Sequence, residues 1–185
     1  MKELKIKGNT VSGFSLSETL MAVLILLLVA SVIAAGIPAA TSAYRNAVDG
    51  ANAQTILSTT VNALRSELST AWDINVDAVN NVIEYNCSRT GARTKLYNDS
   101  GTIKVQDYYI PGASPQPTGE RNLISETITK KSRNATENYG LAFTINSTSA
   151  PGTVTFSAVI VKDGTATPSS DVASIGPITV RFLNP

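Results

Sequence analysis

An uncharged segment near the amino terminus constrains the fold of this chain more than any other feature. From Thr19 to Tyr44, 26 residues carry no charged side chain, and Leu20–Val29 is entirely apolar. About 20 predominantly apolar helical residues span the hydrocarbon core of a bilayer. We therefore expect residues 14–40 to form a single transmembrane helix that contacts the lipid bilayer.

A single carboxylate stands at the start of this segment. Glu18 is the only charged side chain between Lys7 and Arg45. A carboxylate that goes deep into lipid costs roughly 2.5 kcal/mol or more, so a lone acid at this position calls for a positively charged partner. The alternative is that Glu18 reaches the lipid headgroups at the end of an ordinary anchor helix.

Residues 1–13 are short and polar, with three lysines and one glutamate ahead of the apolar segment. Positive charge before a first membrane helix keeps that end in the cytoplasm, so we expect the rest of the chain outside the plasma membrane. A secretory signal has an apolar region of about 7–15 residues followed by a small-residue cleavage site. Here the apolar run is longer, and the small residues at 38–40 include a proline. Cleavage before the apolar segment, after Gly13, would instead leave the helix attached.

The residues Gly13–Glu18 (GFSLSE), after a basic leader and before a long apolar helix, resemble the cleavage and methylation motif of type IV pilins and type II secretion pseudopilins. The resemblance implies that a prepilin peptidase with N-methyltransferase activity removes residues 1–13 as a leader peptide. It implies methylation of the new amino terminus at Phe14. It also implies that Glu18 neutralises the terminal amine of a neighbouring subunit during filament assembly.

Physical chemistry gives the same pair of residues a role. Removal of the leader would create a positive amine at Phe14, about one helical turn from Glu18. Two opposite charges that leave water together cost far less than either charge alone. A pair formed between chains would also set their axial stagger. Ser17 and Thr19 stand where most members of the family carry apolar residues, which favours a minor subunit over an abundant major pilin.

Small residues recur four positions apart along the apolar segment, which lets helices approach each other closely in lipid. The spacing also arises by chance in alanine-rich membrane helices. The pairs are Ala30 with Ala34, Ser31 with Ala35, and Gly36 with Ala40. Pro38 removes one backbone donor from the helix and clashes with the preceding turn. We predict a hinge there: a kink in the membrane-embedded subunit and local melting of residues 33–38 in a filament.

Residues 41–73 continue the helix as an amphipathic segment. Apolar residues follow a four-three-four-three spacing along one face: Leu57, Val61, Leu64, Leu68 and Ala71 or Trp72. Arg65 and Glu67 lie off this face. We expect the face to pack on a globular domain, with Trp72 as a large buried anchor.

Residues 74–185 read as an extracytoplasmic, β-rich domain whose strands begin at Val82. Asn98–Gly101 predicts a hairpin turn between two short strands. A second hairpin with a longer loop is expected from Gly140 to Val161, and a last strand from 177 to 183. Residues 110–117 and 130–134 read as proline-rich and basic loops. The expected fold class is α+β, pilin-like, with a long amino-terminal helix packed on a small antiparallel sheet.

Side chains that carry chemistry are few. The chain has no histidine and one cysteine, so the commonest general base is missing and an intrachain disulfide is excluded. We expect Cys87 to be a core residue at a strand end. We do not expect the protein to be an enzyme or to bind a cofactor or a metal ion. Three basic residues are the candidate ligand contacts: Lys130, Lys131 and Arg133.

The sequence thus favours a structural subunit, a minor pilin or pseudopilin, that is stored in the plasma membrane and drawn into an extracellular or periplasmic filament. Its partners would be the prepilin peptidase, other pilin or pseudopilin subunits and the inner-membrane assembly platform. The motif is shared by motility pili, type II secretion and competence machines. The alternative is a filament-tip adhesin or DNA-capture module on the same stalk, with loops 110–119 and 130–138 as the contacts. For the structural subunit we expect no nucleic acid partner.

Overall fold

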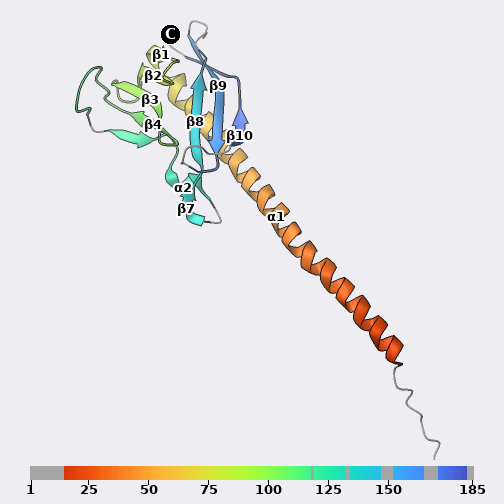
Figure 1. Ribbon diagram of the computed structural model, residues 1–185. Coiled ribbons are helices and arrows are strands. Elements are labelled where there is room, and N and C mark those ends of the chain that lie inside the picture. Colours follow the sequence, from red (N-terminus) through yellow and green to blue (C-terminus); the bar gives the residue numbers. More distant parts are fainter. Residues whose placement is uncertain (1–14, 118, 132–133, 147–151, 165–170, 183–185) are drawn as a thin grey trace, which may run out of the picture. The chain divides into compact units, whose positions relative to one another are not determined.

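The computed structural model describes residues 15–117, 119–131, 134–146, 152–164 and 171–182 (Figure 1). One long helix, α1 (Leu16–Ser69), precedes a set of antiparallel strands. The protein is therefore α+β, as the sequence predicts. Two compact units divide the chain, one up to residue 46 and one from residue 47 onwards.

Two antiparallel sheets make up most of the second unit. Sheet 1 runs in the order β1 (Trp72–Asp77), β2 (Val82–Asn86), β3 (Arg93–Asp99), β4 (Thr102–Gln106) and β5 (Glu120–Asn122). In sheet 2, β9 (Thr153–Lys162) pairs with β8 (Gly140–Ile145) along one edge and with β10 (Asp171–Ile175) and β11 (Ile178–Arg181) along the other. Along the chain, three short elements separate sheet 1 from sheet 2. They are the helix α2 (Glu126–Thr129) and the paired strands β6 (Lys130–Lys131) and β7 (Asn134–Asn138).

The carboxyl-terminal part of α1 is amphipathic and supplies one wall of the core. Its buried residues recur every three or four positions and include the predicted face: Ala53, Ile56, Leu57, Thr60, Val61, Leu64 and Leu68. The inward residues of both sheets join them in a single hydrophobic cluster. In sheet 2, the rings of Phe143 and Phe156 meet edge to face with centroids 5.4 Å apart. In Figure 1, β8 and β9 lie in front of this part of α1.

A polar network fastens the same part of α1 to sheet 1. Two bonds of 3.0 and 3.1 Å join the Arg121 guanidinium on β5 to the Glu67 carboxylate, and the Tyr85 hydroxyl on β2 donates to it at 2.9 Å. The same guanidinium also contacts Asp107, whose Oδ2 lies 3.5 Å from Arg121 Nε. Burial, and then the Glu67 charge, raise the pKa of Tyr85. The Glu67 side chain is only 15% exposed, although the residue lies off the predicted apolar face.

Turn chemistry fixes the register of the hairpins. The β3–β4 loop consists of Ser100 and Gly101, with φ angles of 48° and 75°. Positive φ at both central residues is the conformation that matches the twist of a two-residue hairpin. The hairpin predicted at Asn98–Gly101 is therefore confirmed, as is the β8–β9 hairpin. Residues 110–117 contain neither helix nor strand, as predicted.

Sheet 2 depends on a close backbone approach at one glycine. The register between β8 and β9 shifts near Ser157, where β9 carries an extra residue. β10 pairs with β9 as far as Val159, and β11 resumes the pairing at Phe156. A Cβ atom at Gly176, between the two strands, would lie 2.1 Å from the Ser157 carbonyl oxygen. Only glycine fits there, so β10 and β11 can share one partner strand.

A side-chain amide joins the two sheets. Asn98 Nδ2 donates to the Phe143 carbonyl at 2.7 Å, and the Phe143 N–H donates to Asn98 Oδ1 at 3.1 Å. A backbone bond adds to this contact, because the Leu141 N–H donates to the Gly101 carbonyl at 2.7 Å. The free edge of β8 is therefore paired with the β3–β4 hairpin, which protects it from pairing with another chain.

The junction after the helix differs from its prediction. α1 ends at Ser69 and not at 73, and Trp72 opens β1, ten residues before the predicted first strand. The expectation of a buried Trp72 is wrong, because its side chain is 44% exposed. The buried stripe of the helix ends at Leu68 and is continued by Ala71, after which the chain turns into sheet 1. Cys87 directly follows β2 and is buried and free, as predicted.

The Asn98 clamp makes a testable contribution to stability. We expect Asn98→Ala to lower the free energy of unfolding by about 2 kcal/mol, because it leaves two half-buried backbone groups of β8 without partners. Asn122→Ala is the matched control, since its amide makes a single bond of 3.2 Å to Glu126, and a change within about 0.5 kcal/mol is expected. Fluorescence of the only tryptophan, Trp72, reports unfolding. Equal losses for both variants would contradict the clamp.

Candidate functional site

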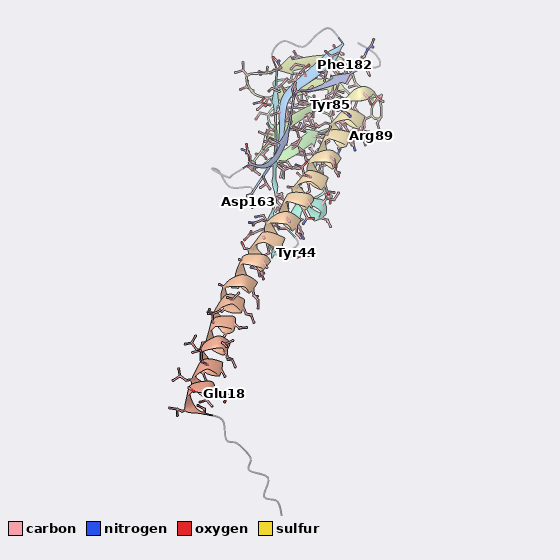
Figure 2. All side chains as sticks on the ribbon, turned by 90° about the vertical axis from the view of Figure 1, so that its right-hand side faces the viewer. Glu18, Tyr44, Tyr85, Arg89, Asp163 and Phe182 are labelled. Carbon is pink, nitrogen blue, oxygen red and sulfur yellow. The ribbon has the colours of Figure 1, made fainter. Side chains whose placement is uncertain are left out.

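The first turn of α1 is formed by Ser15 to Thr19. The Ser15 carbonyl accepts the Glu18 N–H at 2.9 Å and the Thr19 N–H at 3.1 Å. This places Glu18 in the first turn of the helix, where Figure 2 labels it. The predicted processing residues Gly13 and Phe14 lie outside the described residues.

Glu18 is exposed, and within the described part of the chain no side chain pairs with it. A carboxylate in the first helical turn is favoured by the helix dipole, by about 0.3–1 kcal/mol at the surface. That gain is smaller than the roughly 2.5–3.5 kcal/mol that a charge costs at the centre of a membrane helix. The dipole alone therefore does not offset immersion of Glu18 in lipid.

The surface of α1 from Ser15 to Ala47 is exposed at every position. Among the described residues, α1 is the one helix long and apolar enough to cross a bilayer. The hydroxyls of Thr19, Ser31 and Thr41 donate to backbone carbonyls three or four residues earlier, at 2.7–2.9 Å. Because the helix itself satisfies these hydroxyls, they add little polarity to its apolar surface.

The small-residue faces have no partner among the residues that the structure describes. The predicted packing positions Ala30, Ser31, Ala34 and Ala35 are all exposed. A Cβ atom at Gly36 would meet no atom within 4 Å. Nothing in the described chain therefore requires a small residue at these positions.

Pro38 lies inside α1. Residues 33–38 are helical, and the helix continues beyond Pro38. Proline has no N–H, so the Ala34 carbonyl lacks its usual helical donor. The single chain thus shows no melted segment around Pro38. Melting in a filament and a kink in the membrane stay predictions.

The structure describes two of the three candidate basic contacts, Lys130 and Lys131. Lys131 lies in β6, and its ammonium pairs with Asp163 and, at 3.3 Å, with Glu137. It also lies 5.7 Å from the centroid of the Tyr139 ring. The hydrogen bond with Asp163 raises the pKa of Lys131. Figure 2 labels Asp163. Lys130 is exposed in the same strand, which replaces part of the predicted loop, and Arg133 lies outside the described residues.

The outward face of sheet 1 carries a set of polar contacts that the sequence analysis missed. On β4, Lys104 bridges Asp99 and Glu120. The Tyr97 hydroxyl on β3 donates to Glu120 at 2.5 Å. Partial burial, together with this bond, raises the pKa of Tyr97 to about 12. The polar and apolar residues alternate strictly in β4 (TIKVQ), and this strand carries the signal that could have located the face.

Within the described ranges, no group of three or more histidine, cysteine, aspartate or glutamate side chains could hold a metal ion. Comparison of the chain with protein-family models, with curated proteins and with solved structures finds no match.

Proposed function

We propose that this chain is a structural subunit, a minor pilin or pseudopilin, of a type IV pilus or a type II secretion-like filament. The observation that carries the proposal is the state of the first half of α1. It is apolar, exposed along its whole length and headed by a carboxylate without a described partner. Such a segment needs both a covering for its apolar surface and a cation for its acid.

Assembly between copies of the chain supplies both needs. A prepilin peptidase removes residues 1–13 and methylates the new amino terminus at Phe14. The Phe14 amine of one subunit then pairs with Glu18 of another, and the apolar segments pack through their small-residue faces. Before assembly the same segment spans the plasma membrane, with its amino terminus in the cytoplasm and the sheets on the far side.

The alternative of a tip adhesin or DNA-capture module that acts through Lys130, Lys131 and Arg133 has less support. Two carboxylates already hold the Lys131 ammonium, and its side chain is only 16% exposed. A phosphate or polyanion would have to displace both of them. Intramolecular pairing explains this lysine without a ligand.

Removal of the Glu18 carboxylate tests the proposal. We expect Glu18→Ala to leave leader cleavage intact and to lower the amount of subunit in sheared filaments at least tenfold, because the amine of the neighbour then enters the apolar bundle unpaired. Immunoblots of sheared and membrane fractions measure the ratio. Glu126→Ala, which removes an exposed acid from α2, is the control and should assemble normally. Undiminished incorporation of Glu18→Ala would show that the acid has another role.

The small-residue faces give a second test. Gly36→Ile should leave the unfolding of the single chain unchanged, because an added Cβ there meets no atom within 4 Å. It should still reduce incorporation into filaments, because a branched side chain keeps neighbouring helices apart. Gly50→Ile is the matched control, since an added Cβ at Gly50 in the same helix also meets nothing. Normal assembly of Gly36→Ile would contradict packing through this face.

A further inference from the structure

A polar cavity of about 290 Å³ opens on the outward face of sheet 1. It is formed at the β1–β2 end of the sheet, by strands β1, β2 and β3 and by the segment after β4. The Tyr109 N–H donates to the Arg93 carbonyl at 2.8 Å, which holds this segment against β3. The side chains that line it are mostly polar: Asn75, Asp77, Asn80, Glu84, Lys95 and Tyr109.

The two carboxylates of the cavity, Asp77 and Glu84, already have partners on the protein. Asp77 accepts the backbone N–H groups of Val79 and Asn80 at 3.1 Å, and the Asn80 amide at 2.7 Å. Glu84 lies 3.4 Å from the Arg93 guanidinium. Arg93 is also paired with Asp73 at 2.7 Å, and Lys95 lies beside the two acids, so the formal charges of the cavity and its immediate rim sum to −1. Each of the two cavity carboxylates already has donors on the protein, so neither needs a metal ion or an organic cation as its partner.

Other polar groups at the cavity have unused hydrogen-bonding capacity. Among the described residues, none bonds to the exposed amide of Asn75. The Lys95 ammonium lies 5.1 Å from the ring centroids of Tyr97 and Tyr109, and no described carboxylate pairs with it. The cavity thus offers an amide, an ammonium and the remaining carboxylate lone pairs, next to the apolar edge of an aromatic ring.

We propose that this cavity binds a neutral carbohydrate of one or two pyranose units. A sugar hydroxyl donates and accepts at once, so it matches a mixture of amide, ammonium and already partnered carboxylate groups. The C–H groups of the sugar ring match the Tyr109 ring. The volume lies just below the range of about 300–1,000 Å³ for small-molecule pockets, which suits a monosaccharide or disaccharide better than a large cofactor. The inference does not depend on filament assembly.

Ligand-observed NMR on the full chain tests the proposal. The protein is kept in a zwitterionic detergent without a sugar headgroup, because glycoside detergents would compete for the site. The probes are the methyl glycosides of glucose, galactose, mannose and N-acetylglucosamine, with cellobiose, lactose and chitobiose. We expect saturation transfer to at least one probe, and competition between related probes. No transfer to any of them would overturn the proposal, as would tighter binding of glucosamine, a cation, than of N-acetylglucosamine.

Two variants place the binding at the cavity. Asn75→Ala and Tyr109→Ala should each weaken binding of the responding sugar at least tenfold, which corresponds to about 1.4 kcal/mol. Tyr109→Phe keeps the ring and should bind more tightly than Tyr109→Ala. Asn122→Ala, an amide on the same face of sheet 1 outside the cavity, should bind as the unmodified chain does. Tryptophan fluorescence confirms that each variant is folded. Binding that survives both alanine variants would overturn the assignment.

Discussion

The apolar first half of α1 is the constraint on which the rest of the protein depends. Every residue from Ser15 to Ala47 is exposed in the single chain, and Leu20–Val29 is apolar on all sides of the helix. Water is a poor solvent for such a surface, so it requires an apolar covering, which in our proposal is lipid or the same segment of other chains. The charge of Glu18 favours one of these two environments over the other. A lone carboxylate is costly in lipid, whereas an amine on a neighbouring chain offsets most of that cost.

The second half of the same helix follows the opposite regime. From Ala53 onwards one stripe is buried under two sheets, and Glu67 adds a charged anchor to β2 and β5. This half is therefore a fixed part of the β-rich domain, whereas the first half is exposed in the described chain. One helix contains both halves, so whatever covers its first half also retains the β-rich domain. A filament subunit requires that division of roles within one element.

Regular patterns made part of this fold predictable. The stripe through Leu64 shows in the helical spacing, and the β3–β4 turn shows in its residue types. Trp72 was misjudged because the spacing continues past the point where the chain leaves the helix. Glu67 and Asn98 depend on partners 54 and 45 residues away, which no local pattern contains. The long apolar segment could be located from sequence alone, because lack of charge is a local property. The cavity could not, because separate strands bring its residues together.

Intact-mass and amino-terminal mass spectrometry of the protein from its native membranes tests the central claim most directly. The account predicts a chain that has lost residues 1–13, begins at Phe14 and carries one additional methyl group on its amino terminus. Such a chain places a positive charge one turn from Glu18, where assembly requires it. A mature protein that still begins at Met1, or that begins beyond the apolar segment, would contradict the account.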